Sequence, residues 1–244
     1  MPTLAFGSLD INYEVSGSGP LLILHHGFGS WGRDWVRNGW LEALEQHATV
    51  LIFDAVGHGL STRSHDPADH EIERRAAIVV ALADVMNAGK FGFIGFSLGG
   101  RVGFELAASH ADRLLVLAIG GMHLLPPSIE EDRIERRIRV LRSGRARSVE
   151  ETDGERPGND ALALAASQEA LLRWQGAAGR LGGHKAPTML FCGENDRYFA
   201  NAKETASEMG YSFVALPGID HEGTFFSSEL SVRAVDEFVR TNLK

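Results

Sequence analysis

The sequence predicts an α/β fold with a mostly parallel central sheet and helices on both faces. Short apolar runs, typical of strands buried on both sides, occupy residues 21–25, 50–53, 91–96, 114–119 and 188–191. Segments of helical character lie between most of them, notably at residues 73–86 and 101–109. Alternation of strand and helix indicates parallel strands that are joined by right-handed crossovers.

The first two apolar segments, residues 3–6 and 11–15, are separated by Gly-Ser-Leu-Asp, and Ser-Gly-Ser-Gly-Pro follows the second. Glycine, serine and proline at these places are typical of turns. We therefore expect an antiparallel N-terminal strand pair.

Residues 122–185 interrupt the alternation of strands and helices. They contain no convincing strand; one helix is predicted to open at Ser128 and a second to run over residues 160–177. The polar, glycine-containing residues 145–159 predict a loop between them. This segment is expected to be a short helical lid inserted into the fold.

Length and composition predict a single globular domain. The chain has 244 residues, of which 44% are hydrophobic and 23% charged, as in ordinary soluble proteins. We expect one α/β core, formed by residues 1–121 and 186–244, around the lid. The formal charge of −8 repels phosphate backbones, which argues against nucleic acid as a partner.

The single cysteine, Cys192, excludes an intrachain disulfide and a multi-cysteine metal site, and its apolar surroundings predict a buried thiol. The start of the chain, MPTLAFGSLD, lacks the basic and long apolar regions of a leader peptide, and no run approaches the roughly 18 apolar residues of a membrane helix. These features predict a cytoplasmic protein without a membrane partner.

A candidate nucleophile lies at the end of the apolar run 91–96. The run leads into Gly-Phe-Ser-Leu-Gly, residues 95–99, and a helical segment follows directly. In a strand–GxSxG–helix turn, the nucleophile elbow, the backbone at Ser97 is strained and Gly95 and Gly99 avoid clashes across it. The hydroxyl is then exposed at a helix N-terminus, where free amides can stabilise an oxyanion. The alternative is a packing turn in which the serine is incidental.

A serine nucleophile needs a base, and the base needs an orienting acid. Asp196 follows the apolar run 188–191, and His221 follows the run 214–216, so each is placed in a loop beyond a strand end. Asp220 and Glu222 flank His221, but sequence neighbours rarely present a carboxylate to the ring at the required angle.

A second glycine-rich turn, HHGFGSWG at residues 25–32, offers a competing interpretation. Gly27, Gly29 and Gly32 have the spacing GxGxxG after an apolar run, and Asp54 follows about twenty residues later, as in a dinucleotide-binding fingerprint. That interpretation leaves the serine, aspartate and histidine without a role.

On these residues the chain resembles the α/β-hydrolases with a helical lid, in their esterase, lipase and lactonase branch. The order serine, aspartate, histidine is that of the family. The stretch DAVGHGLS, residues 54–61, resembles the family's DxxGxGxS turn, and His26-Gly27 resembles the HG of its oxyanion loop. Some members place the acid after the strand before the lid, where this chain has Gly-Gly-Met-His and no carboxylate, which favours Asp196.

The resemblance implies a catalytic triad of Ser97, His221 and Asp196, with an oxyanion hole formed by the backbone amides of Phe28 and Leu98. Asp54 then belongs to a structural turn rather than to a ribose site. No cofactor and no metal is implied.

Topology suggests an apolar pocket of modest size. The residues expected in its walls, besides Phe28 and Leu98, are Trp31, Phe96, Met122, Leu124 and Leu125.

Two charged groups have simpler interpretations than a binding site. His65, Asp66, Asp69 and His70 match no zinc spacing and are expected at a solvated surface. The arginines of the first lid helix, residues 133–142, alternate with acidic residues, which predicts a solvated face; binding of an acidic substrate is the alternative.

The predicted function is hydrolysis of carboxylic esters of small to medium, largely apolar substrates through an acyl-enzyme. Serine at the elbow argues against the related epoxide hydrolases and haloalkane dehalogenases, which attack through a carboxylate. Lactone hydrolysis, carbon–carbon bond hydrolysis and peracid formation use a similar triad and stay open, as does a small-molecule receptor with little turnover.

Overall fold

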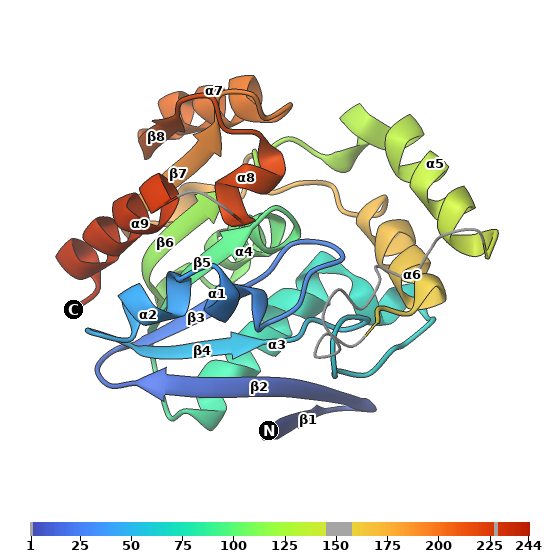
Figure 1. Cartoon of the computed structure of the whole chain (residues 1–244), viewed down its shortest axis with the longest axis horizontal. Helices are drawn as coiled ribbons and strands as arrows, with labels where there is room; N and C mark the ends of the chain where they lie inside the picture. Colours follow the sequence, from blue (N-terminus) through green and yellow to red (C-terminus); the bar gives the residue numbers. More distant parts are fainter. Residues whose placement is uncertain (1, 145–157, 227–228) are drawn as a thin grey trace.

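The computed structural model describes residues 2–144, 158–226 and 229–244. Within them the strands form one eight-stranded sheet in the order β1-β2-β4-β3-β5-β6-β7-β8 (Figure 1). The strands are β1 (Thr3–Phe6), β2 (Leu9–Gly17), β3 (Leu21–His25), β4 (Thr49–Phe53), β5 (Phe91–Phe96), β6 (Leu114–Gly120), β7 (Thr188–Gly193) and β8 (Ser212–Leu216).

The direction of the strands confirms the predicted fold class. β1 and β2 are antiparallel, and β2 joins the sheet by a second antiparallel pairing, with β4. All other neighbours, from β4 to β8, are parallel. The apolar runs of the sequence became strands because each is buried on both faces of this sheet.

Helices cover both faces of the sheet. They are α1 (Asp34–Arg37), α2 (Trp40–Leu44), α3 (Ile72–Val85), α4 (Leu98–Ser109), α5 (Glu131–Arg142), α6 (Ala161–Leu171), α7 (Phe199–Met209), α8 (His221–Phe226) and α9 (Glu229–Asn242). Short 3-10 turns form η1 (Pro67–His70), η2 (Ala111–Arg113), η3 (Pro127–Glu130) and η4 (Leu181–Gly183).

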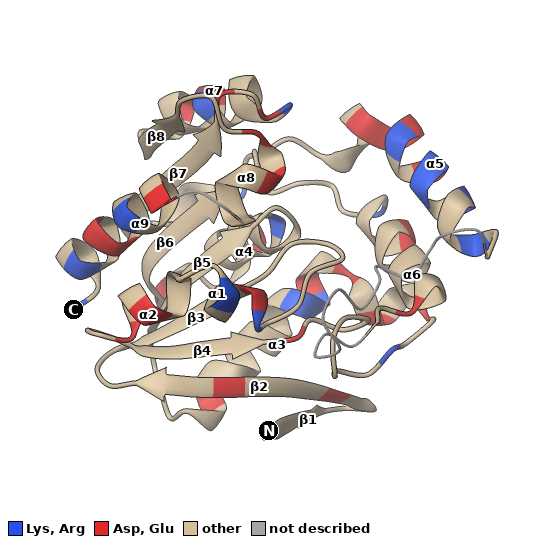
Figure 2. Cartoon of the chain, in the orientation of Figure 1, with Lys and Arg blue, Asp and Glu red and all other residues tan. Residues whose placement is uncertain are grey.

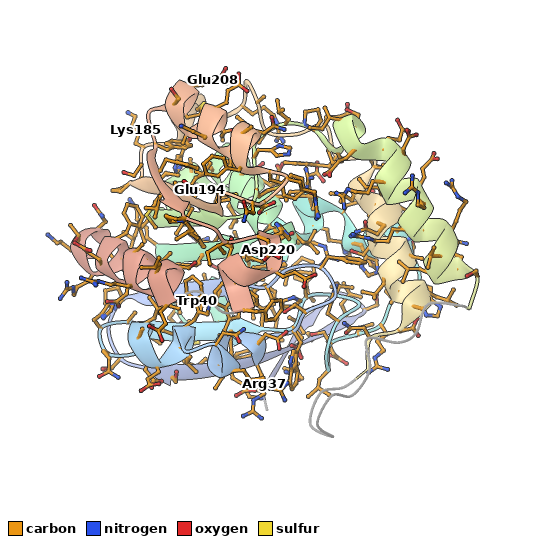
Figure 3. The ribbon with its side chains drawn as sticks, turned by 45° about the horizontal axis from the view of Figure 1, so that its top comes forward. Arg37, Trp40, Lys185, Glu194, Glu208 and Asp220 are labelled. Carbon is orange, nitrogen blue, oxygen red and sulfur yellow. The ribbon has the colours of Figure 1, made fainter. Side chains whose placement is uncertain are left out.

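Successive side chains of a strand point to opposite faces, so the sheet separates two cores. In β3, Leu21 and Ile23 pack into the core that α3, α4 and α7 share, whereas Leu22 and Leu24 pack into the core beneath α1, α2, α8 and α9. The second core contains a group of aromatic rings: Trp35 and Trp40 both pack on Phe225 of α8. Figure 3 labels Trp40, whose indole N–H donates to the Phe225 carbonyl at 3.1 Å.

The parallel strands bring four loops to one edge of the sheet. The last residue of β3, His25, is level with Gly95 near the end of β5, and Gly193 at the end of β7 is level with Leu216 at the end of β8. The loops after β3, β5, β7 and β8 therefore meet beyond the carboxyl ends of the strands, where ligands bind in open α/β sheets.

The described residues between β6 and β7 form helices and turns. Figure 1 shows α5 and α6 side by side, set apart from the helices that flank the sheet, and the two helices pack on each other. Leu141 of α5 and Leu164 of α6 form a small apolar cluster with Phe28 of the loop after β3. The segment thus contacts a loop at the edge of the sheet where the four loops meet.

Two predicted helix limits in this segment were wrong. Ser128 lies in the 3-10 turn η3, and the α-helix begins at Glu131. The second helix ends at Leu171 instead of residue 177, because the chain tightens into i−3 hydrogen bonds and Trp174 turns into the core to donate to Glu105 of α4 at 2.9 Å. The predicted loop 145–159 lies mostly outside the described residues.

Within the described ranges, no helix combines the length and apolar character that crossing a membrane requires. The cytoplasmic location stays a prediction.

Candidate active site

The sharp turn after β5 holds Ser97 in a strained conformation. Its φ of 53° and ψ of −105° are rare for a residue with a side chain. A Cβ on Gly95 would stand 2.2 Å from the Gly99 carbonyl oxygen, and a Cβ on Gly99 would stand 2.2 Å from the His25 carbonyl oxygen. Only glycine therefore allows strand, turn and helix to approach this closely, which is what the GxSxG spacing predicted.

Ser97, His221 and Asp196 come together at this turn. His221 Nε2 lies 3.1 Å from Ser97 Oγ, and His221 Nδ1 lies 2.7 Å from Asp196 Oδ2. A carboxylate only accepts hydrogen bonds, so Nδ1 carries the proton and donates to Asp196, which leaves Nε2 to accept from the serine hydroxyl. This is the geometry in which an imidazole can take the serine proton.

Asp196 is a charged group in a nearly closed environment, with only 5% of its surface exposed. Burial alone would raise its pKa, but the hydrogen bond and attraction to His221, together with the Tyr198 amide, hold the pKa below its usual value. The Tyr198 amide donates to Oδ1 at 3.0 Å. The carboxylate is therefore ionised and fixed toward the imidazole.

Backbone hydrogen bonds join the two loops that carry the acid and the base. The Glu194 amide donates to the Leu216 carbonyl at 3.0 Å, and the Asn195 amide donates to the Ile219 carbonyl at 2.9 Å. Figure 3 labels Glu194 and Asp220, one on each of these loops. The distance between aspartate and histidine is thus set by a pair of joined loops.

The carboxylates beside His221 in sequence have other surroundings. Asp220 Oδ1 accepts from the Gly223 amide at 2.7 Å and so caps the first turn of α8. Glu222 is exposed. Asp196 is the carboxylate that contacts the imidazole, as the position of each residue after its strand had indicated.

A cavity of about 470 Å³ opens beside the serine. Its walls include Ser97 and His221, the loop after β3, α8 and the inner faces of α5 and α6. The residues in the walls are Gly27, Phe28, Gly29, Ser30, Phe96, Ser97, Arg137, Val140, Leu141, Asn159, Ala161, Leu164, Arg197, His221, Glu222, Phe225 and Phe226. Most of this surface is apolar, so the serine hydroxyl faces a site in which an apolar chain can be buried.

Comparison with known proteins agrees with the fold. A family model described as "alpha/beta hydrolase fold" matches residues 20–168. The chain belongs to the α/β-hydrolase family. The family that the sequence resembles is therefore confirmed.

Curated relatives match about half of this α/β-hydrolase. A fluoroacetate dehalogenase of Burkholderia sp is 32% identical over 133 residues, covering 53% of this chain and 42% of that protein. A pimeloyl-[acyl-carrier protein] methyl ester esterase of Vibrio vulnificus is 33% identical over 105 residues, covering 43% of this chain and 38% of that protein. The matched segments span less than half the length of either relative.

Solved structures match almost the whole chain. A hydrolase from Pseudomonas aeruginosa PA01 has a TM-score of 0.81 at 25% identity, covering 98% of this chain and 97% of that one. The enol-lactonase from Burkholderia xenovorans LB400 has a TM-score of 0.80 at 22% identity, covering 98% of this chain and 100% of that one. These structures share the α/β-hydrolase fold.

The two amides predicted for the oxyanion hole, those of Phe28 and Leu98, donate to no described residue in this hydrolase. Leu98 is the first residue of α4, and amides of a first helical turn have no partner within the helix. Among the described residues, neither the Leu98 amide nor the Phe28 amide donates a hydrogen bond. Phe28 borders the cavity, and Leu98 borders a smaller one of about 40 Å³ that also reaches Ser97.

His26 holds the loop that carries Phe28, a role that the sequence analysis missed. Its Nδ1–H donates to the Gly27 carbonyl at 2.8 Å, and its Nε2 accepts from the Ala55 amide at 3.0 Å. Burial lowers the pKa of His26, so the ring stays neutral and can both donate and accept. The resemblance to an HG pair was the signal that could have indicated it.

Asp54 closes the turn beside this loop. It is 2% exposed and accepts hydrogen bonds from the Gly32 amide at 2.7 Å, the Leu60 amide at 2.8 Å and Asn12 Nδ2 at 3.2 Å. These contacts occupy its oxygens inside the protein. The spacing between the glycine-rich turn and Asp54 therefore reflects a structural link between them and not a ribose site.

The predicted pocket is only partly the observed one. Phe96 and Phe28 line the large cavity, and Met122 borders only the smaller one. Trp31, Leu124 and Leu125 lie outside the walls of both.

Each of these three residues has a different environment. Trp31 is buried within its own loop, where its indole N–H donates to Asp34 Oδ1 at 3.1 Å. Leu124 packs into the core beneath α4, and Leu125 is exposed. Nearness to a strand end in sequence did not determine which way these side chains turn.

The cavity wall formed by α5 and α6 was missed. Arg137, Val140 and Leu141 face the cavity from α5, and Leu164 faces it from α6. The spacing of three and four residues from Arg137 to Val140 and Leu141 places them on one helix face, so the signal was present. No local sequence pattern indicated that this helix face would border the cavity beside the serine.

Glu130 fastens the start of α5 to the core of the hydrolase. It forms ion pairs with Arg101 of α4 and with Arg133, and accepts from the Tyr198 hydroxyl at 2.8 Å. The cations lower the pKa of Glu130 although its burial acts in the opposite direction. The Tyr198 ring also contacts the His221 ring, with centroids 5.3 Å apart.

In the described part of the chain, no group of three or more His, Cys, Asp or Glu side chains is arranged to hold a metal ion. His65 instead pairs with Asp160 at 3.2 Å. His70 is buried, with Nε2 2.8 Å from the Ser64 carbonyl, so the expectation of a solvated surface was wrong for this residue.

Proposed function

We propose that this α/β-hydrolase cleaves carboxylic esters of small to medium, largely apolar substrates through an acyl-enzyme on Ser97. One observation supports this most strongly: His221 lies within hydrogen-bond reach of both Ser97 Oγ, at 3.1 Å, and Asp196 Oδ2, at 2.7 Å. A serine that is activated in this way is the nucleophile of acyl transfer.

In the proposed reaction, Ser97 Oγ attacks the ester carbonyl while His221 Nε2 takes its proton. Asp196 holds the imidazole with Nδ1 protonated and stabilises the imidazolium that forms. The imidazolium then gives its proton to the leaving alcohol, which departs as the acyl-enzyme forms. Water, deprotonated by the same imidazole, releases the carboxylic acid and restores Ser97.

The free amides of Phe28 and Leu98 are the proposed donors to the oxyanion of the tetrahedral intermediate. Both are backbone groups, one at the start of α4 and one on the loop that His26 anchors, so they need no side-chain ordering during the reaction. The cavity of about 470 Å³ fits small to medium acyl or alcohol groups. Segment 122–185, which supplies one wall, is proposed to be the lid.

The test is release of p-nitrophenol from acetyl, butyryl, octanoyl and palmitoyl esters by wild type, Ser97→Ala and Ser207→Ala. Ser207 is exposed on α7 and serves as the matched serine control. We expect Ser97→Ala to lower kcat by at least about 10³-fold, because the other groups cannot replace the nucleophile. Ser207→Ala should retain wild-type turnover.

The chain-length profile should favour acetyl to octanoyl over palmitoyl, since a cavity of about 470 Å³ is of the size that suits small to medium substrates. Folded wild-type protein that turns over no ester would contradict the proposal. A single slow acylation without turnover would favour a receptor that retains the triad.

A further inference from the structure

Two guanidinium groups face the cavity that contains the serine hydroxyl. Arg137 comes from α5 and Arg197 from the loop after β7, directly after Asp196. Both also border the smaller cavity of about 40 Å³ that reaches Ser97. The charge of the two groups is therefore presented to whatever lies beside the nucleophile.

Arg137 differs from other arginines of its helix. Arg133, Arg139 and Arg142 form ion pairs with glutamates, as expected for a solvated face. Figure 2 shows the basic and acidic residues along α5. Arg137, by contrast, forms no hydrogen bond or ion pair with any described residue.

Burial disfavours the charge of Arg137, and a contact with the Phe28 ring offsets that only in part. Its guanidinium lies 5.1 Å from the centre of the Phe28 ring, and the side chain is half-buried. Burial lowers the pKa of Arg137, and the nearby cations Arg133 and Arg197 lower it further, whereas Tyr198 and Glu130 act in the opposite direction without forming a hydrogen bond or ion pair with it. A half-buried cation without an anion is costly, and a bound anion would relieve that cost.

Arg197 adds a second cation to the same site. It lies over the Tyr198 ring, 4.8 Å from the ring centre, and forms no ion pair within the described ranges. A guanidinium over an aromatic ring still has N–H groups that can donate to a carboxylate. Glu222 is the carboxylate among the described wall residues of the large cavity, and it is exposed beside His221. Glu130 borders the smaller cavity, where it is paired with Arg101 and Arg133.

We infer that the ester carries a second, anionic group, a carboxylate, which Arg137 and Arg197 bind while the apolar chain packs on Val140, Leu141 and Leu164. This inference rests on the proposed ester hydrolysis. The substrates are then half-esters of dicarboxylic acids. Arg137 and Arg197 determine the specificity of the site for them.

The test compares two methyl esters that differ in one end group, monomethyl adipate and methyl hexanoate. Hydrolysis of the first yields adipate, methanol and one proton, so a pH-stat follows both reactions. We expect the wild-type kcat/KM for the anionic ester to exceed that for the neutral one about tenfold, as for a charge-assisted hydrogen bond.

Arg137→Gln and Arg197→Gln should each lower this ratio of kcat/KM about fivefold or more, mainly through KM of the anionic ester. The control is Arg136→Gln, an exposed arginine of the same helix that is not a wall residue, and it should keep the wild-type ratio. A wild-type ratio of one or less, or an equal loss in all three variants, would overturn the inference.

A binding experiment separates this inference from the proposed function. Calorimetric titration of Ser97→Ala with each methyl ester measures affinity without turnover, and circular dichroism checks the fold of each variant. Preferred binding of monomethyl adipate, lost on adding Arg137→Gln, without hydrolysis by wild type would retain the anion site and reject the esterase. Hydrolysis of both esters with equal kcat/KM and equal affinity would retain the esterase and reject the anion site.

Discussion

At the scale of single residues, the proposed chemistry depends on which carboxylate orients His221. Asp196 is nearly closed from solvent and contacts Nδ1 at 2.7 Å, whereas Asp220 accepts a backbone amide of α8. Because Asp196 accepts a hydrogen bond from Nδ1, it fixes the tautomer of His221 in which Nε2 can accept the serine proton. Asp220 serves the local structure of the loop.

We expect Asp196→Asn to lower kcat for a p-nitrophenyl ester by about 10³- to 10⁴-fold, because the amide can donate to Nδ1 and so favour the wrong tautomer. Asp220→Asn retains an acceptor for the Gly223 amide and should keep kcat near that of wild type. Steady-state kinetics on both variants checks this. A larger loss of kcat in Asp220→Asn than in Asp196→Asn would contradict the assignment of Asp196 as the residue that orients His221.

At the scale of secondary-structure elements, the junction of β5 and α4 is a closely packed point of the site. Gly95, Gly99 and the end of β3 are in contact through backbone atoms, which cannot move as a side chain can. The strain at Ser97 is maintained because strand and helix are both held in the core.

Gly95→Ala should lower the free energy of unfolding by about 3 kcal/mol or more, since its Cβ would stand 2.2 Å from the Gly99 carbonyl oxygen. Gly89→Ala is the matched control, because a Cβ there has no neighbour within 4 Å. Urea denaturation of both variants measures the difference. Equal stability of the two would mean that the elbow is not closely packed.

The helices α5 and α6 show how the position of an element decides what it contacts. The ion pairs of Glu130 hold the start of α5, and the packing of α5 on α6 sets the face that covers the serine. The same arginine-rich sequence on a helix remote from the site would be an ordinary solvated surface.

For the molecule as a whole, buried neutral histidines link folding to pH. Burial is the largest cause that lowers the pKa of His25, His26, His58, His70, His123 and His184. The pKa values of His70 and His123 fall to about 4. Between that pH and about 6.5, the unfolded chain binds more protons than the folded one, so stability decreases as the pH falls.

We expect the free energy of unfolding to begin to fall as the pH drops from 7.5 toward 6.5 and to fall more steeply below pH 6.5, with His70 alone contributing on the order of 3 kcal/mol by pH 4. Urea denaturation at several pH values measures this, and His70→Gln should give a shallower decline. His65→Gln, at an exposed histidine, is the control. Stability that does not change between pH 6.5 and 4.5 would contradict the expectation.

The strands and the elbow could be predicted from the sequence because their signals are local. The runs at residues 21–25 and 91–96 coincide with β3 and β5, and glycines on both sides of Ser97 predicted the strained turn that the structure contains. The positions of Asp196 and His221 followed from parallel strands, whose carboxyl ends share one edge. The predicted topology placed Asp196 and His221 at the same edge of the sheet as Ser97.

The pocket walls could not be predicted in the same way. Trp31, Leu124 and Leu125 stand near strand ends in sequence but turn away from the cavity, while Arg137 and Leu164 reach it from helices far along the chain. Side-chain direction and helix placement depend on packing with residues remote in sequence.

The sequence by itself determined the α/β fold, the order of the candidate triad and the glycines that the elbow requires, because apolar periodicity and backbone sterics act over a few residues. The tertiary structure alone decided which face of α5 covers the serine, and therefore that Arg137 and Arg197 border the same cavity. That juxtaposition comes from the packing of α5 on α6 and from the ion pairs of Glu130, and no local pattern contains it.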